Sequence, residues 1–414
     1  MHPHLTSPRG RGILLLAVAL FLCGNCGGAV CGMPPRVNVS VAEDYNALFR
    51  QEHGWIGADG SASVALSRDV TLWLYADTWV GEIRQGKRAN ASMINNSVAL
   101  LRGKGPAKAS VEFFYRRKAD GKPASQFVPA DGRGFFWPLA GIRTRRGLFL
   151  FAAQVEKTSG SGAFAFRPVA GCLLRIAEPD QPPAQWRPQQ WKIPCAEISP
   201  QREKSCGCAL LEHEGFVYIY GCDDEIASGF HRKHMILARA AADELESFDR
   251  WQFYGGGQWQ SDPAKTQRLF AGAANEYSVS YQAALKQFVA VFTPGGMSEK
   301  IQIRLASRPE GPWGDPITIY HCPEVEWDKR IFCYAAKGHP SVSRAPDELI
   351  VTYVANSTDF WYTAAHAEIY FPRFLRVRFE AAEPAENRSE NQRAIRLSKR
   401  TGERARPRDA VTGR

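Results

Sequence analysis

A single pattern recurs five times along this chain: an alternating strand, a short polar turn and a second strand rich in apolar and aromatic residues. The second strands begin at intervals of 61 to 76 residues, a regular spacing that indicates one structural unit repeated in series. The five segments read SASVALSRDVTLWLYAD, WPLAGIRTRRGLFLFAA, CALLEHEGFVYIYG, YSVSYQAALKQFVAVFT and PSVSRAPDELIVTYVA.

Each hairpin is followed by a third strand, usually with a basic residue, and four of the five are followed by a fourth. The last unit lacks a fourth strand, which the segment RVNVSV at residues 36–41 could supply from the other end of the chain. Antiparallel four-stranded units in series are typical of propellers. The sequence therefore predicts an all-β protein, a five-bladed β-propeller of four-stranded antiparallel blades over residues 32–380.

The two ends of the sequence differ from this body. In residues 1–31, two arginines precede an apolar run too short to span a bilayer, which predicts a secretory signal peptide. We expect a secreted protein, extracellular or periplasmic, with no membrane span. Residues 381–414 predict a disordered basic tail, in which residues 388–414 hold nine Lys/Arg against three Asp/Glu and so carry +6 of the net charge of +10. The body is close to neutral, so we expect no nucleic-acid partner, and we expect a monomer.

Seven cysteines follow residue 31, and in an exported chain they favour disulfides. We expect pairs such as Cys322 with Cys333 and Cys208 with Cys222. Because seven is odd, either one thiol is free or Cys31 belongs to the mature chain. The pair Cys206 and Cys208 has no further partners at a zinc spacing, so no metal site is predicted.

Asp59 and Asp77 lie at the outer ends of the first hairpin. In a propeller, the start of a first strand and the end of a second strand lie on the same face, so both aspartates should meet at one mouth of the ring. The same rule and the long loops beyond the second strands predict the rest of the mouth. The catalytic candidates are Asp59, Asp77, Glu276 and His339, and the substrate-binding candidates are Trp79, Asn96, Trp137, Gln154, Asp223 and Asn356.

Each candidate has a structural alternative. Asp59 in the sequence GADG can cap a turn, and Asp223 with Asp224 can be solvated loop residues. His339, which precedes a proline, can be a satisfied core histidine. Asp77 follows an apolar strand, where a partly desolvated carboxylate favours a functional role.

The segments GWIGADGSASVAL, LWLYADTWVG, INNSVALL, NEYSVSY, GPWGDPITIY and YAAKGHPSVS resemble a known group. This group comprises secreted five-bladed propellers of the domain-of-unknown-function families 4185 and 5005, which are similar to glycoside hydrolase families 43, 32 and 117. The resemblance covers residues 50–380. In the related hydrolases one Asp is base or nucleophile, a second Asp orients the substrate and tunes pKa values, and a Glu is the acid.

Asp59 matches the first of these roles by position. The second and third units open with FFWPLAG and CGCALLEH, which carry no carboxylate at the expected place, so the other roles do not transfer directly. Asp77 could take the second role and Glu276 the third, or His339 could be the acid, as the resemblance to family 117 implies. Hydrolysis needs one protonated and one ionised group across the glycosidic bond, and we expect an inverting arrangement.

Together these features predict a secreted carbohydrate-active protein, a glycoside hydrolase that binds a polysaccharide or oligosaccharide at the propeller mouth. The alternatives are a non-catalytic carbohydrate-binding propeller, favoured by the two missing carboxylates, and a protein-interaction scaffold. No cofactor is required by any pattern, although calcium in the central channel would suit the oxygen ligands at the mouth.

Overall fold

A computed structural model describes residues 35–103, 105–160 and 165–380. The predicted signal peptide and basic tail lie outside the described residues. Strands dominate the regular secondary structure of the described residues, with two short α-helices, α1 (Glu43–Phe49) and α2 (Phe360–Ala365), and five short 3-10 helices. No helix in the described part of the chain is long and apolar enough to cross a membrane.

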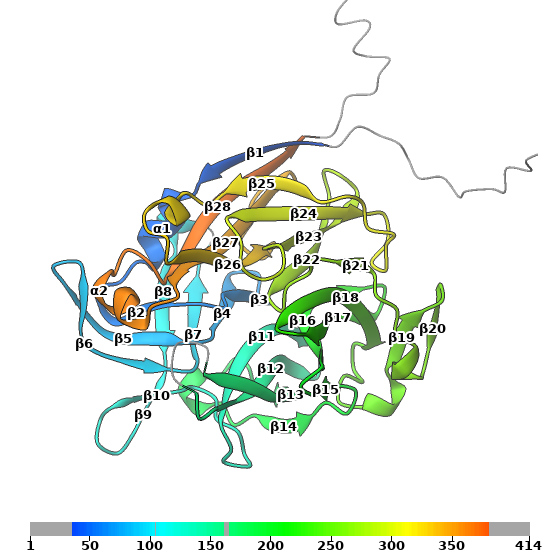
Figure 1. Ribbon diagram of the computed structural model, residues 1–414, viewed down its shortest axis with the longest axis horizontal. Helices are drawn as coiled ribbons and strands as arrows, with labels where there is room; N and C mark the ends of the chain where they lie inside the picture. The colour runs from blue at the N-terminus through cyan, green and yellow to red at the C-terminus, as the bar shows by residue number, and fades with distance from the viewer. Residues whose placement is uncertain (1–34, 104, 161–164, 381–414) are drawn as a thin grey trace, which may run out of the picture. The chain divides into compact units, whose positions relative to one another are not determined.

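Most strands belong to antiparallel sheets formed by consecutive segments (Figure 1). The first sheet contains β3 (Ala62–Ser67), β4 (Val70–Tyr75), β7 (Ser97–Arg102) and β8 (Ser110–Phe114). The second contains β11 (Phe135–Thr144), β12 (Gly147–Lys157), β13 (Phe166–Ile176) and β14 (Gln189–Lys192). The fourth contains β22 (Tyr277–Gln282), β23 (Gln287–Phe292), β24 (Lys300–Ala306) and β25 (Ile317–His321).

The third sheet is larger. Its long central strands are β16 (Arg202–His213), β17 (Phe216–Ala227) and β18 (Phe230–Ala241). Shorter strands extend it: β15 (Glu197–Ile198), β19 (Gln252–Gly255), β20 (Gln258–Gln260) and β21 (Phe270–Ala271). A separate ribbon of β2 (His53–Ala58), β5 (Thr78–Arg84) and β6 (Lys87–Ile94) extends from the first sheet, and a small pair joins β9 (Arg116–Arg117) to β10 (Pro123–Ala124).

The last sheet joins segments from the two ends of the described chain. It contains β26 (Ile331–His339), β27 (Glu348–Ser357), β28 (Pro372–Glu380) and β1 (Arg36–Val41). β1 pairs antiparallel with β28 over its whole length, from Arg36 opposite Glu380 to Val41 opposite Leu375. The predicted pairing of residues 36–41 with the last unit is confirmed.

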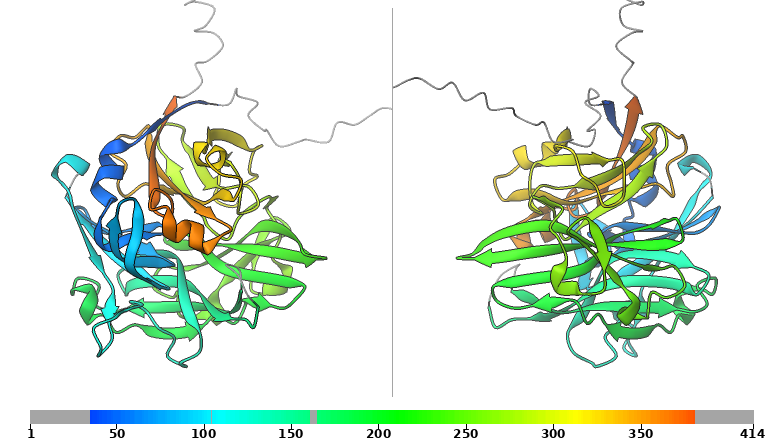
Figure 2. Two further views of the ribbon diagram at one scale, coloured as in Figure 1. Left: turned by 60° about the vertical axis from the view of Figure 1, so that its left-hand side comes forward. Right: turned by 90° about the vertical axis from the view of Figure 1, so that its right-hand side faces the viewer.

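Apolar clusters fill the space between successive sheets. The first strands β3, β11, β16 and β22 each contact the next, β22 contacts β26, and β26 returns to β3 (Figures 1 and 2). Separate buried clusters lie between each neighbouring pair of sheets, including one between the last sheet and the first around Trp73 and Phe374. Every sheet is therefore covered on both faces, which explains why its strands are so apolar.

The predicted first strand of the last hairpin was wrong. We expected it at residues 340–343, but β26 ends at His339 and residues 340–347 form the turn. Pro340 has no N–H to donate to a ladder, which suits a strand end. The Ser343 hydroxyl stabilises the turn by donating to the His339 carbonyl oxygen and accepting from the Ile350 N–H.

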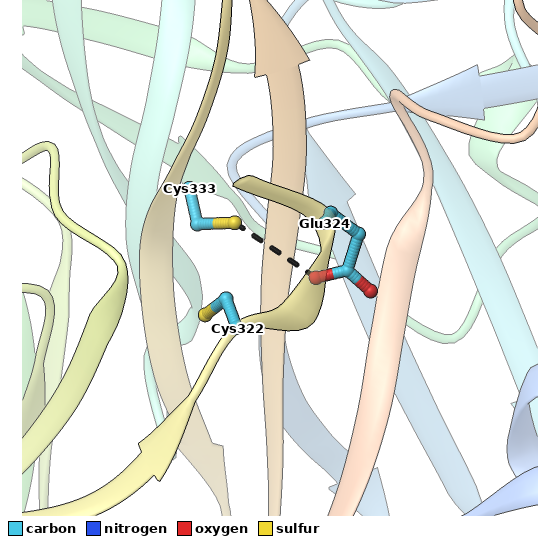
Figure 3. Close-up of side chains that lie close together, drawn as sticks. All are labelled: Cys322, Glu324 and Cys333. Carbon is cyan, nitrogen blue, oxygen red and sulfur yellow. Dashed lines mark hydrogen bonds between the residues drawn. The ribbon is translucent and has the colours of Figure 1, made fainter. Parts of the chain in front are cut away.

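The predicted disulfides are absent, because all seven cysteines among the described residues are free. The Cys195 and Cys206 sulfurs are 3.6 Å apart, well beyond the S–S bond length of about 2 Å. Of the predicted pairs, Cys322 and Cys333 lie together in the core beside Glu324 (Figure 3). Cys208 and Cys222 are buried in one apolar cluster, so packing accounts for their burial.

We expect Val39→Asp to lower the free energy of unfolding by about 2 kcal/mol, because Val39 of β1 packs against the apolar core of the last sheet. Urea unfolding followed by tryptophan fluorescence measures the loss. Ser40→Asp, on the exposed face of the same strand, is the control and should have little effect. Equal stability of both variants would contradict a stabilising role for β1.

Candidate functional site

The first hairpin holds Asp59 and Asp77 side by side through its backbone. The Asp59 N–H donates to the Asp77 carbonyl oxygen at 3.2 Å, and the Ala76 N–H donates to the Asp59 carbonyl oxygen at 3.0 Å. Asp59 lies between β2 and β3, and Asp77 between β4 and β5. The predicted meeting of the two aspartates is therefore observed, although 18 residues separate them in the chain.

Two tyrosines from the last sheet hold the Asp59 carboxylate. Tyr334 on β26 donates to Asp59 Oδ2 at 2.5 Å, and Tyr370, just before β28, donates to the same oxygen at 2.9 Å. Asp59 Oδ1 is buried and has no hydrogen-bond partner among the described residues. Burial, together with the nearby carboxylates of Asp77 and Glu276, raises the pKa of Asp59 well above its usual value.

Asp77 accepts hydrogen bonds from two neighbouring groups. Asn95 Nδ2 donates to Asp77 Oδ1 at 3.1 Å, and the indole N–H of Trp137 on β11 donates to the same oxygen at 2.8 Å. Burial raises the pKa of Asp77 to about 6, against the opposing effect of these two donors. Asp77 therefore titrates close to neutral pH.

Glu276 reaches the same place from the fourth sheet. It immediately precedes β22, and its Oε1 atom lies so close to Gly60 that a Cβ atom at Gly60 would sit 3.3 Å from it. Gly60 also has a φ of +69°, which favours glycine. Burial raises the pKa of Glu276, while Lys337 and Lys233 oppose that shift.

A buried ammonium group lies beneath these carboxylates. Lys337 on β26 is 2% exposed, and its Nζ donates to the carbonyl oxygens of Leu139 at 2.8 Å and Gly60 at 3.3 Å. Burial lowers the pKa of Lys337, and Glu276 and Asp59 counteract this through their charge. The site therefore combines three carboxylates with one internal cation.

This arrangement can perform acid–base chemistry. Burial raises the pKa values of all three carboxyl groups, and the charges of Asp77 and Glu276 further disfavour ionisation of Asp59. One protonated and one ionised carboxyl group in a single site is what glycosidic bond hydrolysis requires.

The structure places His339 away from this chemistry. It is fully buried, with Nδ1 2.9 Å from the Ser63 hydroxyl and Nε2 2.7 Å from the Thr352 hydroxyl, and its ring packs on Trp73. Burial and the nearby Lys337 lower the pKa of His339 to about 3. A neutral imidazole with both nitrogens occupied is a structural residue and a poor general acid.

Only some of the predicted binding residues lie at the carboxylates. Trp137 does, and Asn356 reaches the site indirectly, with Nδ2 3.4 Å from the Tyr334 hydroxyl. Asn96 is buried and bonds the backbone of Phe127 and Phe136, so its role is structural. Trp79 is 5% exposed and packs behind the site, in a cluster with Tyr370.

The other predicted binding residues, Gln154 and Asp223, bind groups other than the three carboxylates. Gln154 is buried and donates to Asp131 and to the Arg133 carbonyl oxygen. Asp223 and Asp224 are buried in β17, so the solvated-loop alternative does not describe them. Asp223 is held by Arg202 and Arg268, and Asp224 lies 2.6 Å from His231 Nδ1.

Four residues near the site were not among the predicted site residues. Tyr334 and Lys337 lie on β26, the first strand of the last hairpin, which was predicted at the wrong place, and Tyr370 lies just before β28. Glu203 lies near the start of β16, which begins earlier than expected, and it accepts a hydrogen bond from Asn275 at 3.5 Å. The third sheet therefore does carry a carboxylate near its start. This carboxylate contacts Asn275, the residue that precedes Glu276 in the chain.

Two places in the described part of the chain bring possible metal ligands together. Cys322, Glu324 and Cys333 bring three ligand atoms within 4.8 Å of one another (Figure 3). The Glu324 carboxylate is already bound by Arg373 at 3.2 Å and by the Tyr353 hydroxyl, which leaves a poor metal ligand. In the centre of the sheets, the carbonyl oxygens that could bind calcium bind the Lys337 ammonium instead.

Comparisons with known proteins agree with this architecture. The sequence pattern of the family described as "Domain of unknown function (DUF5005)" matches residues 42–387. No curated protein matches the chain in sequence. A structure from Bacteroides ovatus ATCC 8483, assigned provisionally as a hydrolase, is 19% identical with a TM-score of 0.64, covering 82% of this chain and 90% of its own.

Weaker structural likenesses are to sugar-active enzymes. A thermostable family-43 glycoside hydrolase is 13% identical, with a TM-score of 0.45, over 81% of this chain and 97% of its own. A levansucrase of Bacillus subtilis is 8% identical, with a TM-score of 0.44, over 82% of this chain and 94% of its own.

The raised pKa of Asp77 predicts a pH-dependent effect on stability. The folded protein holds this proton more tightly than the unfolded chain, so the stabilisation is greatest at low pH and is lost between about pH 4 and pH 6. Asp77→Asn keeps the acceptor oxygen and removes the charge. We expect it to raise the melting temperature at pH 7.5 and to change it little at pH 4.5.

Asp223→Asn is the control, for which we expect the opposite change in melting temperature at pH 7.5. Burial alone would raise the pKa of Asp223, but hydrogen bonds from Arg202 and Arg268 lower it to about 2. Its stabilisation is present above about pH 4, so this variant should melt at a lower temperature at pH 7.5. A lower melting temperature for Asp77→Asn at pH 7.5 would contradict the assignment of a raised pKa.

Lys337→Met tests the buried ammonium. It leaves the Gly60 and Leu139 carbonyl oxygens without their donor, and we expect a loss of about 2 kcal/mol in the free energy of unfolding. Urea unfolding measures it, with Lys122→Met on the surface as the control. Unchanged stability of Lys337→Met would show that the ammonium does not hold the sheets together.

Proposed function

The chain belongs to the DUF5005 family, and we propose that it is a secreted five-bladed propeller that hydrolyses glycosidic bonds in a polysaccharide or oligosaccharide. The observation that carries this proposal is the convergence of Asp59, Asp77 and Glu276, from two different sheets, in one buried group with raised pKa values. Burying a carboxylate costs free energy. A cluster of three buried carboxyl groups is therefore better explained by catalysis than by a structural role.

Asp59 is the proposed base. Its Oδ2 is occupied by the hydroxyls of Tyr334 and Tyr370, so Oδ1 is the oxygen left to accept a proton from an attacking water. The two donors also fix the orientation of the carboxylate before the substrate arrives. Direct attack by water leads to inversion at the anomeric carbon.

Glu276 is the proposed acid. Burial raises the pKa of both Asp59 and Glu276, but the hydroxyls of Tyr334 and Tyr370 favour the ionised form of Asp59. We therefore assign the shared proton to Glu276, which would donate it to the leaving-group oxygen. Asp77 is the proposed tuning residue. Its charge raises the pKa of Asp59, and its hydrogen bond from Trp137 links it to the second sheet.

A non-catalytic carbohydrate-binding propeller is the second candidate. It is favoured by the start of the second sheet, where Trp137 stands in the place of a carboxylate. An aromatic ring with one polar edge suits sugar binding without chemistry. This candidate predicts binding that survives neutralisation of both Asp59 and Glu276.

The decisive experiment is a screen against plant and algal polysaccharides, with reducing ends as the readout. We expect Asp59→Asn and Glu276→Gln each to lower kcat by about 100-fold or more, because each removes one acid–base group. Asp69→Asn, in the turn at the opposite end of the first hairpin, is the control and should retain full activity.

The outcomes separate the candidates. Product from the wild type and the control alone supports hydrolysis, and the anomeric proton signals of the first product then report inversion or retention. Binding to a polysaccharide without formation of product, with the same affinity in both variants, would favour the binding propeller over the hydrolase. Full activity of both variants would remove these carboxylates from the mechanism.

A further inference from the structure

A tryptophan is displayed to solvent beside the candidate site. Trp361 on the short helix α2 is 77% exposed, and the adjacent Phe360 is 38% exposed. Leaving an indole ring in water forgoes the free energy of burying one of the largest apolar side chains. An exposed indole ring can therefore gain free energy by binding a ligand, and the surroundings of Trp361 show what that ligand could be.

The support beneath Trp361 is rigid. The Asp359 side chain caps α2 by accepting hydrogen bonds from the N–H groups of Trp361 and Tyr362. Arg330 pairs with Asp359 at 3.2 Å and lies over the Tyr362 ring, 4.0 Å from its centroid. The exposed ring is thus mounted on a fixed helix.

A second set of contacts holds the other end of α2 and comes from the ribbon of β2, β5 and β6. Arg88 on β6 is largely buried, and its guanidinium donates to the carbonyl oxygens of Thr363, His366 and Ile369. These carbonyl groups lie at the end of α2 and just after it. Asp359 fixes the start of α2 and Arg88 fixes its end. The helix therefore loses little conformational entropy when a ligand binds there.

Two chains of contacts connect this helix to Asp59. In the first, Tyr370 donates to Asp59, Tyr370 clusters with Trp79, and Trp79 packs on Phe360 at 5.2 Å between ring centroids. In the second, Tyr334 donates to Asp59 and accepts from Asn356, whose Oδ1 accepts from Thr363 of α2. These contacts place α2, the helix that carries Trp361, close to the carboxylates.

We propose that Trp361 is the stacking platform of a second sugar subsite, next to the carboxylates, so that the ligand is a saccharide chain of several units rather than a single sugar. The inference rests on the proposed function of the site in glycan recognition. The apolar C–H face of a sugar ring matches the face of an indole, and its hydroxyl groups remain in water. A single ring on a rigid mount suits this occupant better than a broad protein interface, which would need a larger apolar patch.

The test measures binding apart from catalysis. In the Asp59→Asn background, binding of the polysaccharides of the screen, and then of oligosaccharides of two to six units cut from the one bound best, is followed by calorimetry. We expect Trp361→Ala to weaken binding of the longest oligosaccharide about tenfold and of the disaccharide less than twofold. Trp361→Phe should recover part of the loss.

Tyr281→Ala is the matched control. Tyr281 is 49% exposed and lies at the far end of β22 from Glu276, so its removal should leave every affinity unchanged. In the active protein, Trp361→Ala should raise KM for long substrates and leave kcat for short ones unaltered, as expected of a residue outside the reacting centre.

Three results would overturn the inference. Equal affinity of Trp361→Ala and its parent for all lengths would remove the subsite and leave the proposed function intact. An equal loss for short and long ligands would place Trp361 at the carboxylates themselves. No binding and no hydrolysis by the protein with Trp361 intact would refute the proposed function and the subsite together.

Discussion

The structure depends on a buried positive charge at the point where its sheets meet. Lys337 carries an ammonium group into a region that excludes water, which is costly unless hydrogen bonds and opposite charges compensate. The Gly60 and Leu139 carbonyl oxygens supply the hydrogen bonds, and Glu276 and Asp59 supply the charge. One side chain of the last sheet thus binds the backbone of the first and second sheets and faces a carboxylate of the fourth.

Irregularities in the first strands make this contact possible. The ladder of β11 shifts register between Pro138 and Ala140, which releases the Leu139 carbonyl from the sheet. The ladder of β26 shifts between Tyr334 and Lys337, where Ala335 has a φ of +56°. Such bulges bend a strand and turn its groups toward a new direction. Here they direct Tyr334 to Asp59 and Lys337 to the centre, so the fold and the candidate site share the same distortion.

Much of the fold follows from the sequence because strand periodicity is a local property. The alternation in the first four hairpins located their strands, and the alternating RVNVSV segment identified the partner of β28. Asp59 and Asp77 followed from the geometry of one hairpin. Tyr370 could not be found this way, since its approach to Asp59 is set by sheets distant in sequence. His339 was misjudged for a related reason: only packing shows that Ser63 and Thr352 occupy both of its nitrogens.

The pairing of β1 with β28 has a consequence for the order of folding. Residues 36–41 can find their partner only after residues 375–380 are available, so the last sheet is completed after the chain between them exists. Contacts this distant in sequence are slow to form, because a long loop must close first. Until the two strands pair, β28 has an unpaired edge and the apolar surface that β1 covers is exposed. The last sheet of such a protein therefore stays incomplete until residues 375–380 have been synthesised.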